Sequence, residues 1–228
     1  MAEDPGFQIL YEEGPCLVLS KPAGVLTQAP PGIDSLEVRV KAFLQSRDGV
    51  PEPYLGLPHR LDRPATGVII LAKDLRTIRK LGQQFEHRRV HKVYWAWVEG
   101  RVEPETGRWE DHVYKVQGKP QAEVVPPGHP LGRPAALHYR VLKIADRGTL
   151  LEIELETGRT HQIRVQAASR GHPVLGDFQY GSTVPFGPQF EDIRLQAIAL
   201  HARSLTFRHP VTRETVTVVA PVAEYWPP

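Results

Sequence analysis

An aspartate flanked by two arginines lies in a proline-bounded segment in the first third of the chain. The segment reads His59-Arg60-Leu61-Asp62-Arg63-Pro64, with Asp62 between Arg60 and Arg63. Neighbouring guanidinium groups favour the ionised form of a carboxylate. An ionised carboxylate can act as a nucleophile or as a general base. The alternative is an ordinary loop aspartate in a network of ion pairs, and this segment alone leaves both interpretations open.

A second group of cationic residues follows a glycine turn in the second half of the chain. The segment runs from Glu156 to Val165, and its pattern predicts a helix that begins at Thr160 and ends near Gly171. Free N–H groups at the start of a helix, together with nearby arginines, attract a phosphate or a carboxylate. The side chains expected at that helix start are Arg159, Thr160, His161 and Arg164.

Many strands and few helices are expected to position these two segments. Alternating or continuous apolar runs predict strands over residues 7–11, 16–19, 68–72, 92–99, 136–144, 149–156, 200–207 and 215–219. Helices are predicted over residues 33–47, capped by Asp34 or Ser35, and over residues 74–88, capped by Asp74. This pattern favours an α+β fold built on a mainly antiparallel sheet, in one catalytic domain over residues 1–228.

Positive charge is concentrated in one part of the chain. The net charge is only +2, but residues 59–92 contain nine lysines and arginines against three acidic residues. Such a stretch is typical of contact with a nucleic-acid backbone, although a solvated basic surface is the alternative. The candidate backbone contacts are Arg76, Arg79, Lys80, Arg88, Arg89 and Lys92.

Composition excludes several other classes of protein. The single cysteine, Cys16, excludes an intrachain disulfide and a cysteine-rich zinc site, and its apolar surroundings predict a buried thiol. The longest apolar run, Val93 to Val98, is far shorter than the ~20 residues that span a bilayer. Dinucleotide-binding and P-loop motifs are missing as well. A cytoplasmic, soluble protein is expected.

The two charged segments together are highly specific, and the chain resembles the RluA-type pseudouridine synthases. That family isomerises uridine to pseudouridine in ribosomal or transfer RNA. The resemblance covers nearly the whole chain and implies the pseudouridine synthase fold, a mixed, mainly antiparallel sheet with a few flanking helices and a central cleft. The matching segments are Lys21-Pro22-Ala23-Gly24, His59–Asp62 with Thr66-Gly67, Lys92-Val93-Tyr94, Thr157–Val165, Gly171–Asp177 and Leu200-His201-Ala202.

The resemblance also implies roles for individual residues. Asp62 would be the catalytic carboxylate, and Arg164 would pair with it and hold its loop. Tyr94 would stack on the target base and help to remove its C5 proton, while Leu200 would pack beneath the base. Four further residues are expected to bind the substrate: Arg60, Arg63, Arg159 and His161.

The chain departs from the family pattern in two places. Ala65-Thr66-Gly67 stands where Thr-Ser-Gly is usual, so one hydroxyl is kept and one is lost. Gln166 stands where a histidine is common. Neither position is among the four with an implied catalytic role, so the departures concern fine positioning. The extra N-terminal RNA-binding domain that many family members carry is expected to be absent.

The implied reaction is an isomerisation that needs no outside reactant. It breaks the bond between N1 and C1′, turns the uracil over and joins C5 to C1′. No cofactor and no metal are therefore expected. The expected partner is RNA, with no membrane, no obligatory protein partner and a monomeric state. The residues do not choose between attack of the carboxylate at C1′, attack at C6 and removal of the C2′ proton.

Two other functions fit parts of the pattern. An RNA-binding or chaperone module would use the basic residues without catalysis. A nucleoside-type glycosidase would need a second carboxylate to activate water, and Glu156 is the only other acidic residue in the two charged segments.

Overall fold

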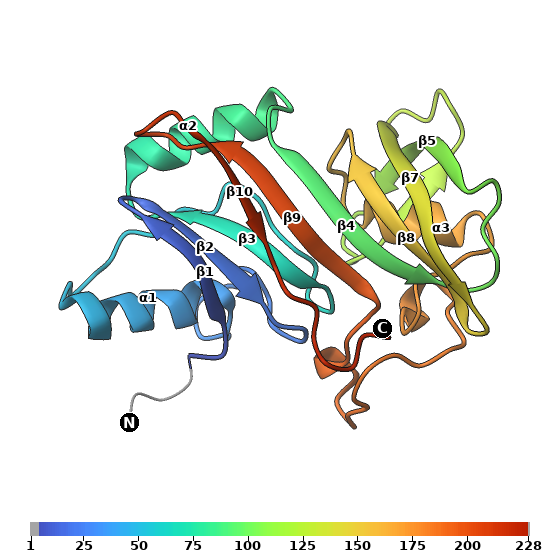
Figure 1. Ribbon diagram of the computed structural model, residues 1–228, viewed down its shortest axis with the longest axis horizontal. Helices are drawn as coiled ribbons and strands as arrows, with labels where there is room; N and C mark the ends of the chain where they lie inside the picture. Colours follow the sequence, from blue (N-terminus) through green and yellow to red (C-terminus); the bar gives the residue numbers. More distant parts are fainter. Residues whose placement is uncertain (1–4, 228) are drawn as a thin grey trace. The chain divides into compact units, whose positions relative to one another are not determined.

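The computed structural model describes residues 5–227, which divide into two compact units (Figure 1). Unit 1 contains the described residues up to Lys92 with Asp192–Leu195 and His201–Glu224, and unit 2 contains Val93–Glu191, Gln196–Leu200 and the described residues from Tyr225 onward. Two compact units can belong to one domain, so the single catalytic domain over residues 1–228 stays a prediction.

Unit 1 is built on five strands, in the order β1-β2-β3-β9-β10. Neighbouring strands are antiparallel except for β3 and β9, which are parallel. Every residue of β3 is buried, as expected for an apolar run in the middle of a sheet. The strands are β1 (Gln8–Glu13), β2 (Cys16–Lys21), β3 (Thr66–Ala72), β9 (Leu200–Arg208) and β10 (Thr215–Val219).

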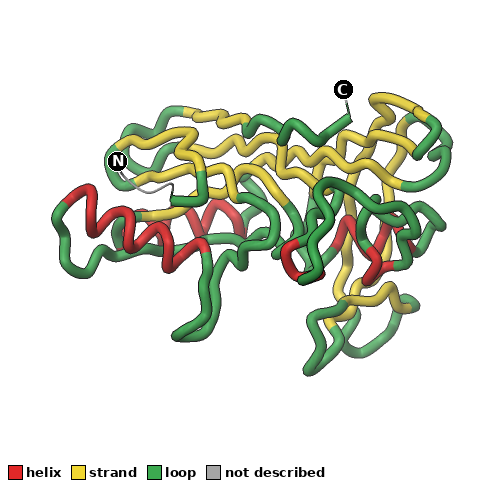
Figure 2. The backbone as a smooth tube through the Cα atoms, turned by 90° about the horizontal axis from the view of Figure 1, so that it is seen from below, coloured by secondary structure: helices red, strands yellow, loops and turns green. Residues whose placement is uncertain are grey.

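Two helices of unit 1, α1 (Leu36–Asp48) and α2 (Leu75–Glu86), lie on the same side of its strands (Figure 2). Ser35 caps α1, because its Oγ accepts a hydrogen bond from the Val38 N–H, and Asp74 caps α2. The buried residues of α2 are Thr77 and Leu81, whereas Leu75 at its start is exposed.

Unit 2 is built on five antiparallel strands, in the order β4-β8-β7-β5-β6. Helix α3 (Gln162–Ala168) contacts β5 and β6. Val165 of this helix joins a small core with Val113, Ala122 and Ala135. The strands are β4 (His91–Val98), β5 (Thr106–Lys115), β6 (Ala122–Val125), β7 (Arg133–Ala145) and β8 (Gly148–Leu155).

The α+β class with a mixed, mainly antiparallel sheet is confirmed, but two predicted helix starts are wrong. Helix α1 begins at Leu36, three residues after the predicted start at residue 33, because Ser35 is its N-cap. Helix α3 begins at Gln162 and not at Thr160, because His161 adopts a left-handed backbone conformation with φ of 51°. Cys16 is fully buried, as predicted. Within the described residues, no helix has both the length and the apolar character required to cross a bilayer.

Candidate active site

Asp62 lies on a loop of unit 1 that leads directly into β3. Its side chain is half-buried, between the buried Leu61 and the half-buried Arg63, while Arg60 is exposed. The loop closes as a turn, because the Ala65 N–H donates to the Asp62 carbonyl at 3.2 Å. The carboxylate is therefore carried at the entrance to a rigid, buried strand.

Residues 21–27 clamp this loop on both sides of Asp62. The Thr27 hydroxyl accepts from the Leu61 N–H at 3.1 Å and donates to the Leu61 carbonyl at 2.8 Å. On the other side, Gly24 and Arg63 exchange two hydrogen bonds of 2.9 Å, one between backbone atoms and one from Arg63 Nε. Gly24 has φ of +78°, a conformation that favours glycine.

Lys21 places a buried cation beneath the same loop. Its side chain is fully buried, and Nζ donates to the carbonyls of Pro22, Val25 and Arg63 at 2.8, 2.9 and 3.2 Å. Burial lowers the pKa of Lys21 to about 7, and the nearby Asp62 opposes this lowering. The geometry thus assigns Lys21 of the Lys-Pro-x-Gly segment to support of the aspartate loop.

His59 anchors the start of the loop as a neutral side chain. Its Nε2 accepts from the Ile70 N–H of β3 at 3.1 Å, and its ring stacks on Phe85 of α2 at 4.6 Å between ring centres. Burial, assisted by Lys92, lowers the pKa of His59 to about 3. A permanently neutral histidine serves as a hydrogen-bond acceptor rather than as a titrating acid or base.

A buried polar chain joins the other end of the loop to β9. The Thr66 hydroxyl and His201 Nδ1 are 2.8 Å apart, and His201 Nε2 is 3.1 Å from the Ala220 carbonyl. Because a carbonyl only accepts, Nε2 carries the proton and Nδ1 accepts from Thr66. Burial lowers the pKa of His201 to about 4. The hydroxyl that this chain keeps beside Gly67 thus ties β3 to β9.

The residues of unit 1 predicted to contact the RNA backbone differ in their exposure and in their side-chain hydrogen bonds. The four arginines at positions 76, 79, 88 and 89 are exposed, and among the residues that the structure describes they have no side-chain hydrogen bond or ion pair. Lys80 donates to the Pro210 carbonyl at 2.7 Å. Lys92 is half-buried, and burial, with a smaller effect of Arg88, lowers its pKa. The arginines are therefore better placed to meet a phosphate than the two lysines.

Arg164 of α3 is held by a buried ion pair in unit 2. Its Nε and Nη2 donate to the two carboxylate oxygens of Asp177 at 2.6 and 2.8 Å, and both side chains are at most 3% exposed. Nη2 also donates to Gln179 at 2.9 Å, and the guanidinium lies over the Tyr180 ring at 4.8 Å. The role of Asp177 was missed in the sequence, although it ends a matching segment.

His161 and Arg159 are fixed on the approach to α3. Since the Ala122 N–H donates to the Tyr180 hydroxyl, that hydroxyl can donate in turn to His161 Nδ1, 2.8 Å away. Arg159 Nε donates to the Pro134 carbonyl at 2.9 Å. A non-glycine residue in the left-handed region is strained by about 1–3 kcal/mol and needs support of this kind.

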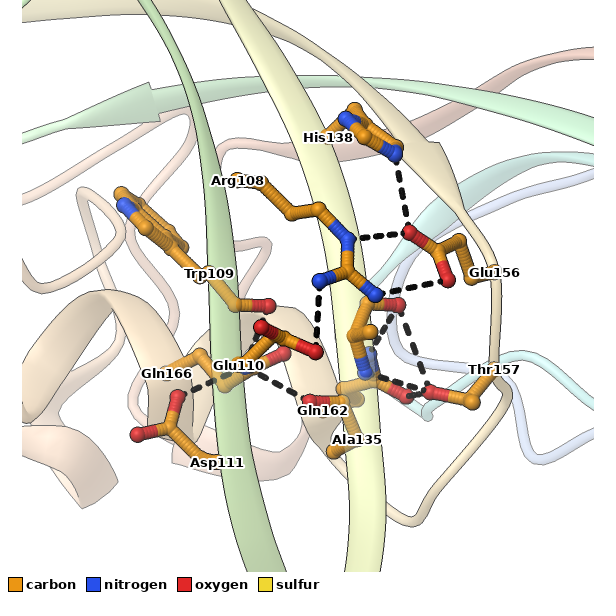
Figure 3. Close-up of polar contacts among 11 residues, drawn as sticks. Arg108, Trp109, Glu110, Asp111, Ala135, His138, Glu156, Thr157, Gln162 and Gln166 are labelled. Atoms are coloured by element: carbon orange, nitrogen blue, oxygen red, sulfur yellow. Dashed lines mark hydrogen bonds and ion pairs between the residues drawn. The ribbon is translucent and has the colours of Figure 1, made fainter.

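The turn before α3 is tied to β7 by two buried side chains (Figure 3). Thr157 Oγ1 accepts from the Ala136 N–H at 2.9 Å and donates to Gln162 Oε1 at 2.7 Å. Gln162 Nε2 donates to the Ala136 carbonyl at 3.1 Å. These bonds fix the start of α3, the helix that carries Arg164, against Ala136 of β7.

Glu156 of unit 2 has two side-chain partners, Arg108 and His138 (Figure 3). Arg108 donates to both of its oxygens at 2.6 and 3.1 Å, and His138 Nε2 is 2.8 Å away. Arg108 holds the pKa of Glu156 below its usual value. A carboxylate with a lowered pKa and both oxygens already engaged is a weak base for activating water, so the structure does not favour the glycosidase alternative.

Gln166 has a packing role in this chain. It is fully buried, and Nε2 donates to Asp111 Oδ2 of β5 at 2.7 Å, as Figure 3 shows. The departure from the usual histidine is thus accommodated between α3 and β5.

The two remaining predicted residues lie in unit 2. Tyr94 is half-buried on β4, opposite Ile153 of β8, and Leu200 is 5% exposed at the start of β9. Asp62 belongs to unit 1 and Arg164 to unit 2. The pairing of these two residues, and their roles, therefore stay predictions.

Within the described residues, no group of three or more His, Cys, Asp or Glu side chains could hold a metal ion.

Comparisons with known proteins place both charged segments in one family. Residues 15–169 match the sequence pattern of the family described as RNA pseudouridylate synthase. The chain is 33% identical to an uncharacterized RNA pseudouridine synthase of Synechocystis sp., over 99% of this chain and 68% of that protein. It is 35% identical to ribosomal large subunit pseudouridine synthase D of Nitrosomonas europaea, over 98% and 64%. The chain spans about two thirds of the length of these relatives.

Solved structures show the same fold. Human RNA pseudouridylate synthase domain containing 4 matches with a TM-score of 0.77 at 24% identity, over 96% of this chain and 89% of that one. Human RNA pseudouridylate synthase domain containing 1 matches with a TM-score of 0.74 at 23% identity, over 97% and 86%. The predicted pseudouridine synthase fold is confirmed.

Proposed function

Because the chain belongs to the RNA pseudouridylate synthase family, we propose that it converts uridine to pseudouridine in structured RNA, with Asp62 as the catalytic carboxylate. The observation that carries the proposal is that the family match spans both the Asp62 loop and the Arg164 segment. Relatives named as ribosomal large subunit pseudouridine synthases favour ribosomal RNA as the substrate.

The proposed reaction needs a carboxylate, a cation and an aromatic surface. Asp62 attacks the target nucleotide or removes its C2′ proton, and Arg164 pairs with the carboxylate and holds its loop. Tyr94 stacks on the flipped base and helps to remove the C5 proton, with Leu200 packed beneath the base. A flipped nucleotide is expected because the glycosidic bond of a stacked uridine is out of reach.

The surroundings of the two charged residues support these roles. Lys21 Nζ donates to the Arg63 carbonyl beside Asp62, which holds the backbone of the Asp62 loop. Asp177 takes two of the Arg164 nitrogens, which fixes the guanidinium plane. The Asp62 backbone and the Arg164 guanidinium are therefore held before any substrate arrives, and such pre-organisation lowers the cost of reaching the transition state.

The remaining parts of the proposal concern cofactors, partners and location. The isomerisation transfers no electrons and no outside group, so we propose that it proceeds without cofactor or metal. Arg60, Arg63, Arg159 and His161 would contact the substrate, and the exposed arginines of α2 and its end would contact the RNA backbone. We also propose that the protein is a monomer and that it acts in the cytoplasm, where ribosomal RNA is modified.

The test is to incubate the protein with an unmodified transcript of the large-subunit ribosomal RNA of its host. We expect pseudouridine at one or a few positions and no released uracil. Asp62→Asn should reduce pseudouridine formation by at least about a thousandfold, with RNA affinity within a few-fold of the wild type. Asp146→Asn, an exposed aspartate in unit 2, is the matched control and should be fully active.

Three outcomes would contradict the proposal. Free uracil in place of pseudouridine would indicate a glycosidase. Full activity of Asp62→Asn would remove that residue from the mechanism. RNA binding without any base conversion, on ribosomal and transfer RNA alike, would favour the non-catalytic RNA-binding module.

A further inference from the structure

Unit 2 carries a groove of about 370 Å³, and among its lining residues only Arg159 has a role in the proposed function. It runs between the ends of β5 and β7 and the turn at residues 158–160. Its nine lining residues include three cations, Lys115, Arg133 and Arg159, and no aspartate or glutamate. The volume is in the range of about 300–1,000 Å³ that is typical of sites for small ligands.

Strand pairing places two of these cations on one face of the sheet. Arg133 of β7 lies directly opposite Val113 of β5, and Lys115 follows Val113 by two positions. Residues two apart on a strand share a face, so Lys115 and Arg133 are diagonal neighbours across the strand pair. Val113 belongs to the core beneath α3, so this is the face on which the turn before α3 lies.

The side chains of Lys115 and Arg133 form no ion pair within the described residues. Both are exposed, and within the described residues neither the Lys115 ammonium nor the Arg133 guanidinium makes a hydrogen bond or ion pair. Like charges that are neighbours across strands repel each other. An anion between them would relieve that repulsion, and a phosphate suits both an ammonium and a guanidinium.

The rest of the groove suits the other parts of a nucleotide. Leu131, which is 46% exposed, adds an apolar side chain to the groove. Apolar surface of this kind can pack against the face of a base. The Thr160 side chain also lines the groove and can hydrogen-bond to a ribose or a phosphate.

We propose that this groove binds one nucleotide of the RNA strand that flanks the target uridine, with its phosphate between Lys115 and Arg133. The inference relies on the proposed function for the identity of the ligand as RNA. The groove shares the turn at residues 158–160 with the segment that leads to Arg164, so a nucleotide bound there would help to align the strand. It supplies affinity without sequence preference.

The test compares two double variants that each remove two positive charges from unit 2. Lys115→Ala/Arg133→Ala removes the two cations proposed to bind the phosphate. Arg101→Ala/Arg147→Ala, at exposed positions outside the groove, is the matched control. The dissociation constant of a fluorescent 12-nucleotide single-stranded RNA is measured over a series of salt concentrations. Urea unfolding of each variant checks that the fold is intact.

The groove variant should bind the RNA about five- to tenfold more weakly near 0.1 M salt. The magnitude of the slope of log affinity against log salt should fall by about 0.7, the value for one lost phosphate contact on a single strand. The control should stay within twofold of the wild type. In the pseudouridine assay, the groove variant should raise KM and leave kcat unchanged.

Equal losses in the two variants would overturn the proposal, because the effect would then be one of net charge. Loss of inorganic phosphate binding without any change in RNA binding would also overturn it, since the groove would then be a site for a small anion. Failure of the proposed function is distinct: the wild type would show the groove-dependent RNA affinity and form no pseudouridine.

Discussion

The Asp62 loop of unit 1 and the Arg164 helix of unit 2 are positioned by different kinds of interaction. The loop is held through its backbone, by the Thr27 hydroxyl and the Lys21 ammonium, and at its start the His59 ring accepts from the Ile70 N–H of β3. Arg164 is held through its own side chain, by the Asp177 carboxylate. In one region the backbone is fixed beside the functional group, and in the other the functional group itself is bound.

This difference indicates how each region should respond to mutation. A backbone held by several separate hydrogen bonds loses about 0.5–1.5 kcal/mol for each typical bond removed. A buried ion pair that loses one partner leaves the other charge unpaired, which costs about 3–5 kcal/mol. A single substitution should therefore reduce the free energy of unfolding more at the Arg164 ion pair than at any one hydrogen bond of the Asp62 loop.

The largest effect is expected for Asp177→Asn. Removing this charge leaves the Arg164 guanidinium buried without its counter-ion, so the free energy of unfolding should fall by about 3–5 kcal/mol. Pseudouridine formation should fall as well, since the guanidinium plane is no longer fixed. Urea unfolding and the activity assay measure the two effects. Asp192→Asn, which breaks the exposed pair with Arg194, is the control and should change stability little. Equal effects of the two variants would contradict the comparison.

The second prediction concerns the stability of the protein below pH 7, which depends on two histidines of unit 1. His59 and His201 have folded-state pKa values of about 3 and about 4, below the 6.5 of an unfolded histidine. Below pH 6.5 the unfolded chain binds protons that the folded chain does not, so stability falls as the pH drops. Between pH 7 and pH 5 the loss should be about 2 kcal/mol for each histidine. Urea unfolding at both pH values measures it, and a flat or rising profile would show that these rings are not neutral and buried.

The third prediction concerns the stability of the protein above pH 7, where Lys21 titrates. Its folded-state pKa of about 7 lies below the ordinary lysine value of 10.5, so above pH 7 the unfolded chain holds a proton that the folded chain releases. Stability should therefore rise with pH, by about 2 kcal/mol between pH 7 and pH 9 for this group. The measurement is the free energy of unfolding of the wild type minus that of Lys21→Met, at pH 7 and at pH 9. This difference should increase by about 2 kcal/mol from pH 7 to pH 9. A constant difference would argue against a buried, titrating lysine.

The smallest effect is expected for Thr27→Val. The substitution keeps the shape of the side chain but removes the hydroxyl that both accepts from and donates to Leu61. Unfolding free energy should fall by about 1–3 kcal/mol, because the Leu61 N–H and carbonyl lose their partner. The aspartate loop would then be less well positioned, so kcat should fall more than KM rises. Thr27→Ser restores the hydroxyl and should recover kcat. If KM carries the whole effect, the clamp acts on binding and not on positioning.

Local patterns in the sequence were enough for most of the elements. Alternating apolar residues located β8, and a continuous apolar run located β3, because side-chain period and burial are local properties of a strand. Asp74 was predicted as a cap for the same reason, while the choice between Asp34 and Ser35 was left open and the structure shows Ser35. Helix α3 was misplaced by two residues, since the left-handed conformation of His161 is imposed by contacts such as that with Tyr180, which lies 19 residues further along the chain.

The sequence by itself determined the family and the residues proposed for catalysis, because they lie in short segments whose residue types and spacing are specific. Only the tertiary structure revealed which residues hold them: Thr27 clamps a residue 34 positions away, and Asp177 binds Arg164 across 13. Hydrogen bonds and ion pairs of this kind depend on distance in space, which a linear pattern does not encode. The same holds for the groove at Lys115 and Arg133, which exists only because two strands pair in one register.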